Sequence, residues 1–247
     1  MSINKYIPNF VTLLNLFCGS IAVVFAVHNN FVAASAFVFL GIFFDFFDGL
    51  LARKLNVQSP LGVQLDSLAD MVTSGLVPGI VMFKLISMSI NAPEMLTQNE
   101  WNSNFSFSEF NIAPLALIGL FITLASAYRL AKFNIDEDQQ TYFKGLPTPA
   151  NALLVLSLPL IIEFQNSSLA TSLLLNQWFL IGFTLLSCYF LNSNIKLIAL
   201  KFKDFSFANN KFRYILIIST IVLLVLLHFM AIPLIILLYI ILSLIKR

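Results

Sequence analysis

Charged residues are scarce in this sequence. Asp, Glu, Lys and Arg together make up 11% of its 247 residues, whereas soluble globular domains carry about 25%. Hydrophobic residues account for 59%, and the mean hydropathy is +0.89. This balance excludes an intrinsically disordered chain and a nucleic-acid-binding domain, and it leaves almost no room for a soluble domain. We therefore expect the chain to lie within a lipid bilayer.

Cysteine and histidine are also rare, with two residues of each type. Cys18 and Cys188 lie in separate apolar stretches and lack the spacing of a metal site. A disulfide-stapled secreted module is therefore excluded, and both are expected to pack as small hydrophobic residues. His28 and His228 are expected at the membrane interface, on the opposite side from the acidic cluster described below.

Long apolar stretches dominate the chain, and about 20 helical residues are needed to cross the hydrocarbon core. Eight can be marked out, at residues 8–27, 31–52, 65–89, 112–131, 149–163, 169–191, 213–229 and 231–245. All should be helices, because a lone strand cannot satisfy its backbone in lipid and no barrel-like alternation is present. The first lacks an Ala-x-Ala cleavage pattern, which favours a membrane helix over a signal peptide.

These stretches predict an all-α integral membrane protein, a polytopic bundle of about eight transmembrane helices. We expect a six-helix core within residues 1–195 and a C-terminal helix pair within residues 196–247. The turn near Met230 and Pro233 is very short, so the last two stretches are also compatible with one bent helix. Six or seven spans therefore remain alternatives.

Basic residues indicate how the chain is oriented. With eight spans and a cytoplasmic N-terminus, Lys84 is the one basic residue of fourteen on the far side. The loop over residues 90–111, on that far side, instead carries three Glu residues. By the positive-inside rule we expect a multi-pass protein of the cytoplasmic membrane with both termini in the cytoplasm.

Four aspartates stand at the end of the second apolar stretch and the start of the third. They are Asp45, Asp48, Asp66 and Asp70. Spacings of three and four residues place each pair on one helical face. An ionised Asp at the bilayer centre costs roughly 2.5–3.5 kcal/mol, so four facing lipid would cost on the order of 10–14 kcal/mol. The four side chains are therefore expected to face one another across a hydrated cavity.

The residue types in this cluster point to metal-assisted phosphate chemistry. Converging carboxylates need a positive partner, and oxygen-only ligands suit Mg²⁺, Mn²⁺ or Ca²⁺ rather than Zn²⁺. Gly49 and Ala52 leave space beside the helix backbone, and Arg53 can clamp phosphate oxygens at the cytoplasmic mouth. We expect one or two cations beside a diphosphate, with Ser59 and Pro60 shaping the loop before Gly62.

The spacing of these residues resembles the complete signature of the CDP-alcohol phosphatidyltransferases. The matching positions are Asp45-x2-Asp48-Gly49-x2-Ala52-Arg53-x8-Gly62-x3-Asp66-x3-Asp70. The resemblance implies a membrane enzyme that moves a phosphatidyl group from a CDP-activated lipid to a small alcohol and releases CMP. It also implies two divalent cations, Mg²⁺ or Mn²⁺, held by the four Asp residues, with Asp70 as the base that deprotonates the acceptor hydroxyl.

The same resemblance implies which residues bind the CDP lipid. Gly49, Ala52, Arg53, Ser59 and Gly62 would contact the CDP moiety. Pro8, Asn9 and Thr12, at the start of the first apolar stretch, resemble the nucleotide-proximal entry segment of the family. The resemblance covers roughly residues 1–195, which would form the catalytic membrane domain.

A second pair of segments resembles the phosphatidylserine synthase branch of this family. They are Arg-Leu-Ala-Lys-Phe-Asn at residues 129–134 and Gly-Leu-Pro-Thr-Pro at residues 145–149. The resemblance implies that the acceptor binds at Arg129, Asn134, Lys144, Gly145, Pro147 and Thr148. Lys132 departs from the branch, which more often has Arg at that position. The basic residues of these segments also suit the carboxylate of serine, whereas inositol or glycerol would need mostly neutral partners.

The expected activity is transfer of the phosphatidyl group from CDP-diacylglycerol to the hydroxyl of L-serine, in phospholipid biosynthesis. Within the family, glycerol 3-phosphate and inositol or its phosphate remain alternative acceptors. A divalent-cation transporter is a distant alternative, because intramembrane carboxylates also line ion pathways. Expected partners are the two substrates and the bilayer, with no nucleic acid, and the bare apolar faces are compatible with a homodimer.

Overall fold

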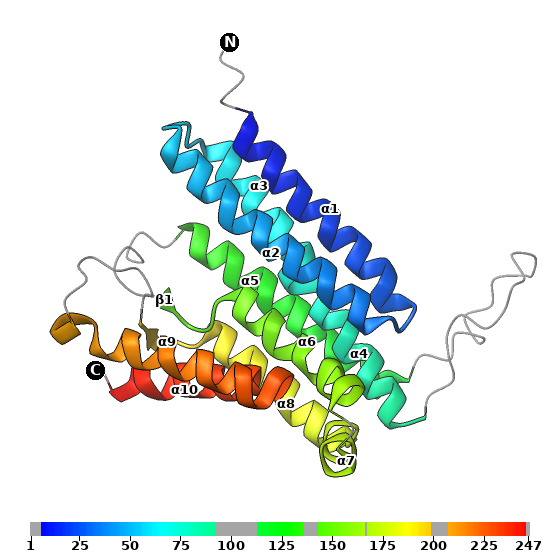
Figure 1. Ribbon diagram of the computed structural model, residues 1–247. Coiled ribbons are helices and arrows are strands. Elements are labelled where there is room, and N and C mark those ends of the chain that lie inside the picture. Colours follow the sequence, from blue (N-terminus) through cyan, green and yellow to red (C-terminus); the bar gives the residue numbers. More distant parts are fainter. Residues whose placement is uncertain (1–5, 92–112, 136–142, 166, 199–206, 246–247) are drawn as a thin grey trace, which may run out of the picture.

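The computed structural model describes residues 6–91, 113–135, 143–165, 167–198 and 207–245. Within them almost every residue is helical, and the helices form one bundle (Figure 1). The prediction of an all-α polytopic membrane protein is confirmed. Large apolar side chains such as Phe10, Phe17 and Leu124 remain exposed on the outside of the bundle, as expected for surfaces that face lipid.

Two long helices and one interrupted helix form the N-terminal part of the bundle (Figure 1). They are α1 (Ile7–Val27), α2 (Phe31–Lys54) and the run of α3 (Pro60–Asp70), the π-helix η2 (Met71–Leu76) and α4 (Val77–Ser89). Asn29 and Asn56 adopt positive φ angles of 60° and 54° in the turns that follow α1 and α2. Asn tolerates this conformation, so these turns are short and α2 and α3 meet at the same end of the bundle.

The third apolar run begins earlier than the sequence predicts. We expected it from residue 65, but helix α3 begins at Pro60, and Gly62 lies within its first turn. The Ser59 side chain caps the helix by accepting a hydrogen bond from the Gly62 N–H at 3.1 Å. Hydropathy missed this first turn because it is amphipathic, whereas the Ser cap followed by Pro is a helix-start signal.

The π-helix η2 has a cause in the sequence. Pro78 stands just inside α4, where it has no N–H to donate and where its ring would clash with the carbonyl four residues earlier. That carbonyl belongs to Ser74, inside η2. The wider turn also frees the Gly75 carbonyl, which accepts a hydrogen bond from Thr123 Oγ1 at 3.2 Å. The widened turn therefore accommodates a proline in the middle of a membrane helix.

The remaining helices pack against this first group. They are η4 (Pro114–Leu120) with α5 (Phe121–Ile135), α6 (Thr148–Phe164), α7 (Ser168–Leu174), α8 (Gln177–Asn192), α9 (Phe207–Leu227), η5 (His228–Met230) and α10 (Ala231–Ile245). A short antiparallel pair, β1 (Phe143–Lys144) with β2 (Lys196–Leu197), joins the segments before α6 and after α8. Its two-residue strands carry no sequence pattern, and the pair was not predicted.

Among the residues that the structure describes, five helical runs are long and apolar enough to cross a membrane: Ile7–Val27, Phe31–Lys54, Pro60–Ser89, Pro114–Ile135 and Asn210–Ile245. Helices α7 and α8, bent by 65° relative to each other, would be a sixth, and α6 is a shorter apolar helix. The last run folds back at His228, whose φ is 48°, so α9 and α10 lie side by side (Figure 1). The expected count of eight is reached only when α6, the bent pair and both arms of this hairpin are each counted as a span.

Candidate active site

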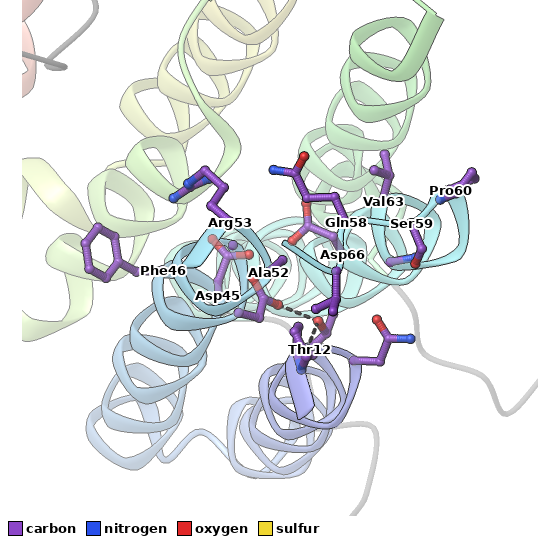
Figure 2. A pocket seen from close by; sticks show the side chains of 16 residues that line it. Thr12, Asp45, Phe46, Ala52, Arg53, Gln58, Ser59, Pro60, Val63 and Asp66 are labelled. Carbon is purple, nitrogen blue, oxygen red and sulfur yellow. Dashed lines mark hydrogen bonds between the residues drawn. The ribbon is translucent and has the colours of Figure 1, made fainter. Parts of the chain in front are cut away.

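Three of the four predicted aspartates converge. Asp45 and Asp48 come from α2 and Asp66 from α3, and one oxygen of each lies within 4.8 Å of the others. We call these three residues the acidic triad. Asp45 and Asp66 point into the space between α2 and α3 (Figure 2). Three carboxylates at this separation form an oxygen-rich group that could hold a hard divalent cation.

The fourth aspartate lies one helical turn beyond the triad. Asp70 is 9% exposed, and its Oδ1 accepts a hydrogen bond from Asn15 Nδ2 on α1 at 3.3 Å. It is close enough to the triad for its charge to repel that of Asp66. Asp70 does not belong to the group whose oxygens converge within the described residues. Its predicted roles as ligand and base remain predictions.

Helix α1 supplies a direct contact to the triad. Thr12 is 3% exposed, and its hydroxyl lies 2.5 Å from Asp48 Oδ2 and 3.1 Å from the Pro8 carbonyl oxygen. A hydroxyl has one proton to donate, and the shorter distance assigns it to the carboxylate. Thr12 therefore orients Asp48 from α1. This contact places the start of the first helix beside the aspartates of the second, where Pro8, Asn9 and Thr12 were expected to lie near the nucleotide.

A cavity of about 970 Å³ opens beside the triad. Its lining includes all eight residues predicted to bind the CDP lipid: Pro8, Asn9, Thr12, Gly49, Ala52, Arg53, Ser59 and Gly62. The structure therefore brings together side chains from α1, α2, α3 and the connection between α2 and α3. Figure 2 shows this lining, with Phe46 and Pro60 at opposite edges.

Five lining residues were not predicted to bind the lipid: Phe46, Val57, Gln58, Pro60, which was expected only to shape the loop, and Val63. Gln58 directly precedes Ser59, the N-cap of α3. A polar residue next to a predicted binding residue was therefore a usable sequence signal. Phe46 is 62% exposed, and its neighbour Asp45 is the only sequence clue to its position. Apolar residues of this kind look the same in sequence whether they face lipid or a cavity.

Arg53 lies over the helix surface that Gly49 leaves open. A Cβ atom added at Gly49 would come within 3.3 Å of the nearer terminal nitrogen of Arg53. The guanidinium is exposed at the cavity, and its charge acts on the Asp48 carboxylate. This arrangement suits a diphosphate. Arg53 could pair with some of its oxygens, and metal ions held by the three acids would neutralise the others.

The residues predicted to bind the acceptor are only partly brought together. Arg129, 8% exposed, donates a hydrogen bond from Nη1 to the Lys144 carbonyl at 3.2 Å. A small hollow of about 10 Å³, which we call the basic hollow, is lined by Arg129, Lys132, Lys144, Leu191, Asn192 and Ser193. Sequence reasoning missed Asn192 and Ser193, which lie 48 or more residues further along the chain than Lys144.

The other predicted acceptor residues lie elsewhere. Asn134 hydrogen bonds to Ser67, with Nδ2 and Oγ 2.9 Å apart, and so joins α5 to the turn after Asp66. Gly145 has a φ of 74° and donates its N–H to the Ile195 carbonyl at 2.9 Å. Pro147 and Thr148 form the beginning of α6. None of these four residues lines the basic hollow, and Gly145, Pro147 and Thr148 form the connection that leads from β1 into α6.

Comparison with known proteins agrees with the site. The family model for CDP-alcohol phosphatidyltransferase matches residues 5–189, which include the acidic triad and the whole cavity lining. The chain belongs to this family. The match ends before α9 and α10, so the C-terminal hairpin lies outside the family region.

Several curated relatives within the family are named CDP-diacylglycerol–serine O-phosphatidyltransferase. The Bacillus subtilis protein is 34% identical over 146 residues, which cover 59% of this chain and 70% of that protein. The Methanocaldococcus jannaschii protein is 33% identical over 169 residues, covering 68% and 66%. The Helicobacter pylori strain J99 protein is 31% identical over 150 residues, covering 60% and 54%. This chain thus spans between about half and 70% of the length of these family members.

Proposed function

We propose that this chain transfers the phosphatidyl group of CDP-diacylglycerol to the hydroxyl of L-serine, giving phosphatidylserine and CMP. The observation that carries the proposal is one cavity lined by the acidic triad and by all eight residues expected at the CDP lipid. Serine as the acceptor is supported by the names of the relatives. It is also supported by the basic hollow at Arg129 and Lys144, because serine carries a carboxylate.

The donor set of the triad fits Mg²⁺ or Mn²⁺. Asp45, Asp48 and Asp66 offer only carboxylate oxygens, which hard divalent cations prefer, and they border a cavity rather than packed apolar side chains. We propose two ions, with Asp70 as the additional ligand one turn away. When bound, they would neutralise the diphosphate and stabilise the leaving CMP.

The side chains of the protein then have distinct parts in the reaction. Asp70 accepts the proton of the serine hydroxyl, and Asn15 holds one oxygen of that carboxylate. The serine oxygen forms a bond to the phosphorus of the phosphatidyl group. The bond from that phosphorus to the bridging oxygen of the diphosphate breaks, and CMP leaves. Arg53 pairs with phosphate oxygens at the cavity, where Gly49 and Ala52 leave room for them.

The acceptor is proposed to approach from the side of α5. Two contacts align α5 with the third helical run: Asn134 bonds to Ser67, and Ser126 lies against Gly75. Arg129 stands between these contacts on α5, and Asp70 stands between them on the other run. The serine carboxylate at Arg129 and the hydroxyl at Asp70 would then lie at the same depth of the bundle.

The orientation in the membrane is part of the proposal. We place the chain in the cytoplasmic membrane with both termini and the cavity on the cytoplasmic side, because the basic residues gather there by sequence. The exposed apolar faces are compatible with a homodimer. Acyl chains of the lipid substrate would reach the cavity from the bilayer past Phe46, which is exposed at its edge.

An acceptor screen tests the proposal. Purified protein is supplied with CDP-diacylglycerol, Mg²⁺ or Mn²⁺ and, in turn, L-serine, glycerol 3-phosphate, inositol or inositol phosphate, and CMP release is measured. We expect release with serine and its loss in Asp66→Asn, while Glu163→Gln, which alters an exposed carboxylate on α6, retains it. Turnover with a phosphorylated polyol alone would refute serine as the acceptor. Cation flux in proteoliposomes without CMP release would favour the transporter alternative.

A further inference from the structure

The C-terminal hairpin binds the segment that follows α8. Tyr239 on α10 donates its hydroxyl to the Ile198 carbonyl at 2.9 Å. Ser243, one turn further on the same face, accepts a hydrogen bond from the Ile198 N–H at 3.1 Å and donates to the Tyr239 carbonyl at 2.7 Å. Both backbone polar groups of Ile198 are thus held by one face of α10.

This contact is continuous with the basic hollow. Ile198 directly follows β2, and β2 pairs with β1 so that Lys196 stands opposite Lys144. The Lys144 carbonyl in turn accepts the hydrogen bond from Arg129. A chain of hydrogen bonds therefore runs from two side chains of α10, through the backbone of β2 and β1, to the guanidinium of Arg129.

Apolar packing makes the connection rigid. Leu146, Leu197, Ile236 and Ile240 form one buried cluster, with exposed fractions between 1% and 9%. Leu197 belongs to β2 and Leu146 follows β1 by two residues, while Ile236 and Ile240 come from α10. Close-packed side chains transmit a displacement rather than absorb it, so the strand pair is expected to move with α10.

The position of Arg129 depends on this arrangement. Arg129 is almost completely buried, and among the described residues its hydrogen bond goes to a backbone carbonyl rather than to an acid. It also lies within electrostatic reach of the Tyr239 hydroxyl. A buried Arg with such partners keeps its donors available for an anion, but only while the carbonyl that orients it stays in place.

We propose that the C-terminal hairpin, which lies outside the family region, positions Arg129 for the carboxylate of the acceptor. Tyr239 and Ser243 are the positioning residues, and they act through Ile198 and the strand pair. The inference rests on the proposed transfer to serine. A hairpin that only anchored the chain in lipid would have no need of two side chains that bind the backbone beside the acceptor segment.

The test is a steady-state analysis of full-length Tyr239→Phe, Ser243→Ala and the double variant. We expect the KM for serine to rise about fivefold in each single variant and more in the double variant, because each substitution removes one hydrogen bond to Ile198, worth about 1 kcal/mol net. The KM for CDP-diacylglycerol should change less than about twofold, since the lipid cavity is formed by other helices. Tyr239→Phe keeps the ring, so the packing of α10 is retained.

Two controls match these variants. Tyr189→Phe removes a hydroxyl from an exposed ring on α8, and Ser172→Ala removes one that bonds only within α7, to the Leu169 carbonyl. Both should leave the KM for serine unchanged. Thermal unfolding of each protein separates positioning from stability, because a purely structural role would lower the melting temperature without raising the KM for serine selectively.

The outcomes separate the two proposals. Wild-type protein that releases CMP with serine, together with a folded double variant whose KM for serine is unchanged, would overturn the positioning role and leave the proposed function standing. Equal changes in both KM values would also overturn it. Wild-type protein that shows no serine-dependent release would refute the proposed function, and this inference with it.

Discussion

Removing one carboxylate from the acidic triad should stabilise the protein when no divalent cation is present. At the 4.8 Å that bounds their separation, two unit charges repel by about 3.5 kcal/mol at an effective dielectric constant of 20 and by about 0.9 kcal/mol in bulk water. Asp45→Asn removes two of the three pairs. The relief is therefore between about 2 and 7 kcal/mol when all three carboxylates are ionised. The lower end is expected because the cavity is open to water and because crowded carboxylates take up protons.

The same substitution should abolish the response to a cation. A cation at about one hundred times its dissociation constant stabilises a protein by about 2.7 kcal/mol, so wild-type protein should melt at a clearly higher temperature with Mg²⁺ or Mn²⁺ than with a chelator. In Asp45→Asn the chelated protein should melt about 4–8 °C higher than chelated wild type, from a relief of about 2 kcal/mol. Its further rise on adding cation should be much smaller.

Thermal unfolding in detergent, followed by intrinsic fluorescence, measures both quantities. Glu163→Gln is the matched control, because it removes a negative charge from an exposed position on α6. It should follow wild type with and without cation. An Asp45→Asn protein that is less stable than wild type in chelator, and that still shows the full cation response, would refute the idea that the triad is a repulsive, cation-holding group.

Three further substitutions test separate parts of the site. Asp70→Asn should lower the initial rate of CMP release by about 100-fold or more, while the acidic triad keeps part of the cation-induced rise in melting temperature; a near-normal rate would contradict the base assignment. Thr12→Val should raise the cation concentration needed for half-maximal activity by about 10-fold or more, because it removes a hydrogen bond to a charged ligand. The control Thr184→Val, whose hydroxyl bonds only within its own helix, should not change it. Gly145→Ala should destabilise the protein by about 2–5 kcal/mol, because φ is 74° and the new Cβ would come within 2.6 Å of a backbone carbonyl. Gly182→Ala, which meets nothing within 4 Å, should leave the melting temperature equal or higher.

The part of the cavity formed by α2 and α3 was predictable from local spacing, whereas Pro8, Asn9 and Thr12 on α1 were predicted from the resemblance to the family. Asp45 and Asp48 share one helical face by periodicity alone, and the Ser59 cap fixes where the next helix begins. The resemblance to the family then supplied the assignment of Arg53 to the CDP lipid. Apolar stretches likewise marked the five long apolar helical runs of the described residues, since lipid leaves helices as the main solution for a chain of this composition.

The acceptor region was less predictable because it depends on distant segments. Arg129 meets Asn192 only after α8 has returned to the same end of the bundle, and no local pattern encodes that return. The β1–β2 pair has two residues in each strand, too few for periodicity. Asp70 has the spacing of a fourth ligand, yet its oxygens lie apart from the triad, one helical turn beyond Asp66, where Asn15 donates a hydrogen bond to it.

The π-helix η2 makes the number of residues in the third run as important as their identity. A widened turn contains one residue more than an α-helical turn, and one residue corresponds to about 100° of rotation around the axis. The π-helix therefore rotates the side chains of α4 around the axis relative to those of α3. With this rotation, Asp66 on α3 faces Asp45 and Asp48 while α4 still packs its buried face against the bundle. Deleting any single residue between Met71 and Leu76 would leave the composition almost unchanged but would turn Asp66 away from its partners. This segment should accept substitutions of similar size and reject every change in length.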